Sequence, residues 1–230
     1  MASTAPRSTG TESRRPALSG IRPSWHQRLL WATLEVPVSV DLENGFSHTP
    51  EDVAETVRMA LSTGLAGVSI EDWSGHHLYE KELAVERGHA AVEAADSQLV
   101  VTLRAENHLH GVDDFDDTVA RLSACGRAGA DVVYAPGLST TEQIATVVSV
   151  VETPVNVLVR PGVPKLSELT EIGVGRVSVG GSFAFAAYQA LAEAASEFMH
   201  MDTYGFLDAA STGSALFQEA FPHRPETDTA

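Results

Sequence analysis

Short runs rich in valine and isoleucine alternate with longer helix-like segments from residue 36 to residue 198, and this alternation constrains the fold more than any other feature of the chain. The strand-like runs are VPVSVD (36–41), AGVSIED (66–72), QLVVTLRAE (98–106), ADVVYAPG (130–137), PVNVLVRPG (154–162) and GRVSVGG (175–181). The segments between them carry helix signals, such as Thr49 as an N-cap followed by Pro50 at the first helical position. Apolar strands separated by helices are typical of a parallel sheet that helices cover.

The regular run of six strand–helix units predicts an α/β fold of the (β/α)8 TIM-barrel type. A complete barrel has eight such units. We therefore expect an incomplete barrel that lacks the first two strands, because the largely polar residues 1–35 cannot supply them. On the pattern alone, an open doubly wound sheet of six strands is the alternative. The chain has no GxGxxG motif that would mark a dinucleotide-binding turn.

Three regions are expected along the chain. Residues 1–35 read as a disordered or atypical arm, because their first part is rich in Ser, Thr, Pro, Gly and Arg and poor in large apolar side chains. Within the arm, WHQRLLWATLE (25–35) could form a helix that leads into the first strand. Residues 36–198 form the barrel domain, and residues 199–230 form a C-terminal helical extension with a tail.

Charge and composition exclude several classes of function. The chain has 31 acidic and 15 basic residues and a formal net charge of −16, so it is a poor partner for nucleic acid or anionic lipid. It contains no apolar run long enough to span a membrane. The single cysteine, Cys125, excludes an internal disulfide framework and suits the reducing cytoplasm, where we expect the protein to act.

Charged residues gather where the first three strands end: Asp41 and Glu43, then Glu71 and Asp72, then Arg104 and Glu106. The carboxyl ends of barrel strands meet at one mouth, and alternate residues of a strand face the same way. Carboxylates this close would raise one another's pKa unless a cation offset their charge. Mg²⁺ typically takes one or two carboxylates and keeps several waters, so the spacing indicates a metal site. The alternative is that single acids such as Asp41 or Asp72 only cap the following helices.

Five stretches together resemble the isocitrate lyase/phosphoenolpyruvate mutase superfamily, closest to its unassigned bacterial branch: VSVDLENGF, GVSIED, TLRAENHLHG, GADVVYAPGL and PVNVL. The resemblance covers about residues 36–198 and implies a (β/α)8 barrel that binds Mg²⁺. It also implies an enzyme that makes or breaks a C–C or P–C bond next to a pyruvyl unit, through a metal-stabilised enolate. The substrate would be a small 2-oxo acid or phosphonate.

The resemblance also suggests roles for individual residues. Asp41 resembles the principal metal carboxylate, Glu43 stands where the family often has Asp, and Glu71 is similar to a water-mediated metal ligand. Arg104 resembles the clamp for the substrate anion and is expected to bind substrate together with Asn156. The expected catalytic residues are Arg104, Glu106 and Asp72. The C-terminal helices of this superfamily pack on a neighbouring subunit, so a homo-oligomer is an option for this chain as well.

The chain departs from the superfamily in two ways. The stretch WSGHHLYEKELAVERGH (73–89) lacks the loop cysteine of isocitrate-type lyases, so cleavage through that cysteine is not expected. Cys125 reads as a small buried apolar residue instead. Polar residues near the mouth are acid/base candidates, although a solvated loop explains them equally well: His76, His77, Tyr79, Lys81, His108 and His110. The second departure is the shortened start of the barrel.

Three functions remain open on the sequence. The leading hypothesis is the Mg²⁺-dependent lyase, mutase or hydrolase described above. The second is a catalytically impaired, truncated remnant that serves as a binding or assembly module. The third is a phosphate-binding barrel that uses the turn VSVGGS (177–182), which resembles the glycine-rich phosphate turn after late barrel strands.

Overall fold

The computed structural model of the protein describes residues 36–221. Its internal contacts divide the chain into two units, one ending at Ser178 and the other beginning at Val179, and each unit is described separately below. The expected arm and the expected helix at 25–35 lie outside the described residues. The boundary expected between residues 198 and 199 stays a prediction.

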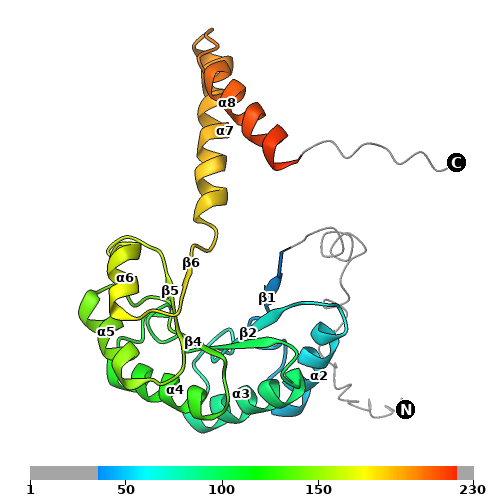
Figure 1. Ribbon diagram of the computed structural model, residues 1–230, viewed down its shortest axis with the longest axis vertical. Coiled ribbons are helices and arrows are strands. Elements are labelled where there is room, and N and C mark those ends of the chain that lie inside the picture. The colour runs from blue at the N-terminus through cyan, green and yellow to red at the C-terminus, as the bar shows by residue number, and fades with distance from the viewer. Residues whose placement is uncertain (1–35, 222–230) are drawn as a thin grey trace, which may run out of the picture. The chain divides into compact units, whose positions relative to one another are not determined.

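The first unit contains one six-stranded parallel sheet, in which each strand pairs with its neighbours in chain order. The strands are β1 (Ser39–Asp41), β2 (Gly67–Glu71), β3 (Val100–Arg104), β4 (Val132–Tyr134), β5 (Val155–Leu158) and β6 (Arg176–Ser178). The sheet curls, and the helices lie along its outer side (Figure 1). This arrangement confirms an incomplete barrel of the TIM type. A doubly wound sheet reverses its strand order at one point, so the described sheet excludes that alternative.

Five helices of the first unit cover the sheet where the sequence signals place them. They are α2 (Pro50–Leu61), α3 (Lys81–Ala95), α4 (Phe115–Arg127), α5 (Thr141–Val150) and α6 (Leu166–Ile172). The Thr49 side chain accepts the backbone N–H of Asp52 at 3.3 Å, which satisfies a free donor at the start of α2. Thr140 caps α5 in the same way. These capped starts fix where each loop at the carboxyl end of a strand turns back into a helix.

Strand residues alternate between two environments. One set packs against the helices and forms the apolar core, including Val68, Ile70, Val101, Leu103, Val133 and Val157. The other set lines the inner side of the curled sheet, including Asp41, Ser69, Thr102, Arg104, Tyr134, Asn156 and Ser178. These side chains border an open hollow of about 420 Å³. The polar residues of the strands therefore share one concave surface, because side chains alternate along a strand.

The described part of the second unit, residues 179–221, contains two helices, α7 (Ser182–His200) and α8 (Phe206–Ala220). The carboxylate of Glu197 closes the turn between them by accepting the backbone N–H groups of Gly205 and Phe206 at 2.5 and 3.1 Å. Neither helix, over its described length, buries a residue. Across residues 36–221, we find no helix with the length and apolar character that crossing a membrane would require.

Candidate active site

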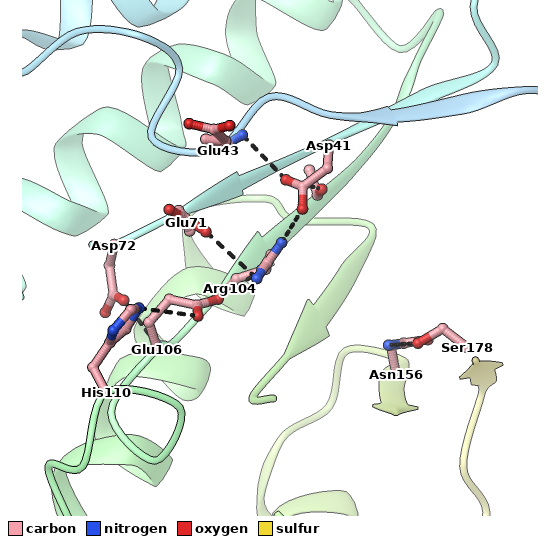
Figure 2. Close-up of polar contacts among 10 residues, drawn as sticks. Asp41, Glu43, Glu71, Asp72, Arg104, Glu106, His110, Asn156 and Ser178 are labelled. Atoms are coloured by element: carbon pink, nitrogen blue, oxygen red, sulfur yellow. Dashed lines mark hydrogen bonds and ion pairs between the residues drawn. The ribbon is translucent and has the colours of Figure 1, made fainter. Parts of the chain in front are cut away.

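Arg104, the last residue of β3, is the centre of a cluster of acids at the carboxyl ends of the first three strands (Figure 2). Its Nε donates to Oε1 of Glu106 at 2.7 Å, and its Nη2 lies 3.4 Å from Oε2 of Glu71. Its Nη1 pairs with Oδ2 of Asp41. The register explains the encounter, since Glu71 and Arg104 are directly paired positions of β2 and β3. The structure thus brings together four of the residues expected at the mouth.

The loop after β1 orients Asp41. Its Oδ1 accepts the Glu43 backbone N–H at 3.1 Å and the Ser69 hydroxyl at 2.9 Å. Glu43 adopts a left-handed φ of 50°, which turns the chain sharply after the strand. Among the described residues, the Glu43 carboxylate makes no hydrogen bond or ion pair, and Figure 2 shows it apart from Arg104. Glu43 therefore contributes to the cluster through its backbone and its charge.

Negative charge exceeds positive charge in this cluster. Burial, followed by the neighbouring Glu106 carboxylate, raises the pKa of Glu71 to about 7 against the opposing effect of Arg104. Burial also raises the pKa of Glu106, again against Arg104. Burial lowers the pKa of Arg104, but the surrounding carboxylates, Glu106 first, outweigh it and raise this pKa. A second cation would relieve the repulsion that remains.

The donor set fits a hard divalent cation such as Mg²⁺, since it consists of carboxylate oxygens on a partly open surface. Asp41 is the most accessible of the three acids that pair with Arg104, with 52% of its side chain exposed. Within residues 36–221, no three His, Cys, Asp or Glu side chains converge closely enough to hold an ion by themselves. Mg²⁺ commonly uses only one or two carboxylates and completes its sphere with water and substrate oxygens. The assignment of Asp41, Glu43 and Glu71 as metal ligands stays a prediction.

Asp72 is buried beside the cluster, and both of its carboxylate oxygens are bonded. Oδ1 accepts the backbone N–H of Glu106 at 2.8 Å, and Oδ2 accepts from Arg121 at 3.1 Å. Arg121 in turn donates to Asp117 at 2.5 Å and to the carbonyl of Tyr79 at 2.9 Å. Burial raises the pKa of Asp72, and Arg121 opposes this shift. These bonds show how Asp72 holds the backbone that carries Glu106, while its expected catalytic role stays a prediction.

Sequence reasoning missed two buried arginines that organise the site, Arg121 and Arg87. Arg87 on α3 is 1% exposed and donates to the carbonyls of Ser47 and Asn44 at 2.6 and 2.5 Å. Its guanidinium also lies over the ring of Tyr79, 4.1 Å from the centroid. These contacts fix the loop after β1, which carries Glu43. The one sequence signal for either arginine was the i, i+4 spacing of Asp117 and Arg121, which is typical of an ion pair on one face of a helix.

Asn156 lies on β5, on the same concave surface as Arg104. Its amide donates to the Ser178 hydroxyl at 2.9 Å, and its Oδ1 is buried without a hydrogen-bond partner in the described part of the chain (Figure 2). Tyr134, which the sequence did not single out, lies between the two, with Arg104 5.3 Å from its ring centroid. A free acceptor on the hollow suits a polar ligand, and substrate binding by Asn156 stays a prediction.

The other polar candidates lie in loops around the mouth. His76 and His77 are exposed, and His77 bonds to Ser74 at 3.1 Å. Tyr79 is buried, and its hydroxyl bonds to Nδ1 of His48 at 2.6 Å, so it serves to pack the loops. Lys81 is the first residue of α3.

Two further elements named from the sequence fall outside the cluster. Cys125 is buried, as expected, and burial raises the pKa of its thiol to about 12. The turn at 177–182 spans the boundary between the two units. Its role in phosphate binding stays a prediction.

Comparison with known proteins agrees with this geometry. Residues 25–199 match the family model described as phosphoenolpyruvate phosphomutase. An uncharacterized protein of Mycobacterium tuberculosis (strain ATCC 25618 / H37Rv) is 33% identical over 181 residues, which cover 74% of this chain and 68% of that protein. The 2-methylisocitrate lyase of Escherichia coli (strain K12) is 28% identical over 148 residues, covering 60% of this chain and 46% of the enzyme.

A solved structure shows the same fold at higher identity. A lyase/mutase candidate from Burkholderia cenocepacia J2315 superimposes with a TM-score of 0.76 and 46% sequence identity, over 81% of this chain and 70% of the other. The match of the family model over most of the chain agrees with the curled parallel sheet. The chain belongs to the phosphoenolpyruvate phosphomutase family, within the isocitrate lyase/phosphoenolpyruvate mutase superfamily.

Proposed function

We propose that the protein is a Mg²⁺-dependent lyase or mutase that acts on a C–C or P–C bond next to the pyruvyl unit of a small 2-oxo acid or phosphonate. The observation that carries the proposal is the position of Arg104, surrounded by Asp41, Glu71 and Glu106 at the ends of three consecutive strands. The names of two relatives support it: one is a 2-methylisocitrate lyase and the other a lyase/mutase candidate.

Each side chain has a distinct task in this proposal. Glu106 holds the Nε of Arg104, so the two terminal nitrogens remain to face a ligand. Those nitrogens now face Asp41 and Glu71, and a substrate carboxylate or phosphonate would take their hydrogen bonds in a bidentate manner. Asp41 and Glu71 would then be available to hold the cation, with Glu43 nearby.

The charge that develops on the substrate determines what the site must do. Breaking a bond next to a pyruvyl unit leaves negative charge on an enolate oxygen, and a positioned guanidinium stabilises such charge in a site of low dielectric. A bound Mg²⁺ supplies Lewis-acid stabilisation of the same oxygen. Asn156, with its free acceptor on the concave surface, would contact a hydroxyl or amine of the substrate.

Thermal unfolding with Mg²⁺, with oxalate and with both together tests the proposal, because oxalate mimics a pyruvate enolate. A ligand at a hundred times its dissociation constant adds about 2.7 kcal/mol of stability. For a chain of this length, we expect the midpoint to rise by roughly 5–10 °C, and only when both additives are present. A cooperative transition whose midpoint does not change with both additives at saturating concentration would contradict the proposal.

A pair of matched variants shows where the ligand binds. Arg104→Met should abolish the increase in midpoint, because it removes the anion clamp while keeping an unbranched side chain. Arg58→Met is the control, since Arg58 is an exposed arginine on α2 whose one ion-pair partner within residues 36–221 is Glu55. It should keep the full increase. Equal increases for both variants would place oxalate elsewhere.

A further inference from the structure

Glu106 is the most deeply buried acid of the cluster, and one of its oxygens has no hydrogen bond. The side chain is 0% exposed, and Oε1 accepts from Arg104 at 2.7 Å. Oε2 has no hydrogen-bond partner among residues 36–221. A buried carboxylate oxygen without a donor is costly when the group is ionised. The structure therefore leaves room for one more donor at this oxygen.

His110 is the side chain next to this oxygen. Its Nε2 lies 3.8 Å from Oε2 of Glu106, within ion-pair distance but beyond a hydrogen bond (Figure 2). The backbone N–H of His110 donates to the carbonyl of Glu106 at 3.2 Å, so one turn of chain holds the two residues together. A small rotation of the imidazole would close the remaining gap.

Trp73 fixes the plane of the imidazole. The two rings are stacked, with centroids 3.7 Å apart and an interplanar angle of 5°. The His110 side chain is 29% exposed, whereas Glu106 is fully buried. The imidazole of His110 thus borders solvent on one side and a buried carboxylate on the other.

We propose that His110 is a positioning residue that acts through Glu106 on Arg104. The Nε2–H of the imidazole donates to Oε2, orients the Glu106 carboxylate, and so keeps Oε1 bonded to Nε of Arg104. A hydrogen bond to a charged acceptor of this kind is shorter and stronger than a neutral one. Without this donor, the hold on Glu106 weakens and Arg104 binds the substrate anion less tightly. The role toward substrate rests on the proposed function.

Other charged groups face the same pair and must be separated from it in any test. Arg104 lies on β3, Asp41 on β1, and Glu71 and Asp72 lie at the end of β2. Glu71, whose pKa is about 7, changes charge near neutral pH, so binding is compared at one pH, where Glu71 is mostly ionised. A comparison of variants at His110, all of which retain Glu71, isolates the contribution of the imidazole.

The first test needs neither metal nor substrate. Urea unfolding compares the wild type, His110→Ala, Glu106→Gln and the double variant. If the imidazole holds the Glu106 carboxylate, the loss of stability in the double variant should be smaller than the sum of the two single losses. Losses that add in full would overturn the inference.

The second test measures binding of oxalate in the presence of Mg²⁺ by calorimetry at pH 8. We expect His110→Ala to bind oxalate about tenfold more weakly than the wild type, because it removes the donor to Glu106. His110→Gln keeps a side-chain donor, so it should retain most of the affinity. His89→Ala is the control, since His89 is an exposed histidine on α3 that pairs with Glu93, and it should behave as the wild type.

The outcomes separate the two proposals. Wild-type protein that binds no oxalate with Mg²⁺ would overturn the proposed function, whatever urea unfolding shows. Equal oxalate affinity in the wild type and in His110→Ala would overturn the role of His110 alone. A histidine that only packs against Trp73 would lower stability when removed but would leave the oxalate affinity unchanged.

Discussion

Replacement of Asp72 by alanine should destabilise the fold far more than the same change at an exposed aspartate. Asp72 is 6% exposed and receives two hydrogen bonds, one from the backbone N–H of Glu106 and one from Arg121. Asp72→Ala leaves both donors without this partner in the interior. The matched control is Asp113→Ala, since the Asp113 side chain is 93% exposed and pairs with His108 at 3.4 Å.

The magnitude follows from the contacts that are lost. Removing one partner of a buried ion pair typically costs about 3–5 kcal/mol, and a buried N–H without an acceptor costs about 1–3 kcal/mol. Arg121 keeps its bonds to Asp117 and to the carbonyl of Tyr79, which limits the damage. The raised pKa of Asp72 shows that burial already penalises its charge. We therefore expect a loss near the lower end, about 3 kcal/mol.

Urea unfolding followed by circular dichroism at pH 7.5 measures this loss. Roughly 3 kcal/mol corresponds to a drop of about 6–12 °C in thermal midpoint for a chain of this length. Asp113→Ala should change little, because exposed ion pairs contribute little to stability. Asp72→Asn keeps an acceptor for the Glu106 N–H and should lie between the two. If Asp72→Ala were as stable as Asp113→Ala, the structural role assigned to Asp72 would be wrong.

Three further predictions follow from single side chains. The folded-state pKa of Glu71 is raised from 4.5 to about 7, so its contribution to the free energy of unfolding falls as pH rises through that range. Glu71→Gln removes this titration. The pH dependence of stability, measured by urea unfolding, should therefore become flatter by at most about 3 kcal/mol. Cys125 is 6% exposed, so it should react with a thiol reagent only when urea unfolds the protein, and rapid reaction of the native chain would contradict its burial. Gly137 has a φ of 109°, and a Cβ added there would lie 2.7 Å from the Cβ of His108. Gly64 has a φ of 82°, but a Cβ added there would enter open space. Gly137→Ala should therefore lower the thermal midpoint more than Gly64→Ala.

Much of the fold could be predicted because its signals are local. Thr49 and Pro50 indicate the start of α2, and the helix spans Pro50–Leu61 in the structure. The carboxyl ends of parallel strands meet at one mouth, so the convergence of Asp41, Glu71 and Arg104 also follows from spacing alone. The second inference also requires successive strands to pair in chain order, and the regular strand–helix alternation indicates that order.

The burial of Arg87 and the contact of Tyr134 with Arg104 depend on contacts that no local sequence pattern predicts. Arg87 stands in the polar stretch VERGH of α3, where a charged side chain ordinarily faces solvent. It is buried because the loop at 42–49 folds across it and offers two carbonyl oxygens. Tyr134 contacts Arg104 because β3 and β4 are neighbours in a register that the sequence does not specify. Burial of a polar residue is a property of its partners, and those partners come from elsewhere in the chain.

The charge of the cluster explains why we expect cation and substrate to bind together. Three carboxylates, those of Asp41, Glu71 and Glu106, face one guanidinium, so a substrate anion entering alone would add to an existing excess of negative charge. Arg104 also cannot donate fully to Asp41 and to a substrate at the same time. A divalent cation balanced by Asp41 and Glu71 would free the terminal nitrogens of Arg104 for the substrate. Because such coupling is reciprocal, oxalate should raise the affinity for Mg²⁺ by the same factor by which Mg²⁺ raises the affinity for oxalate.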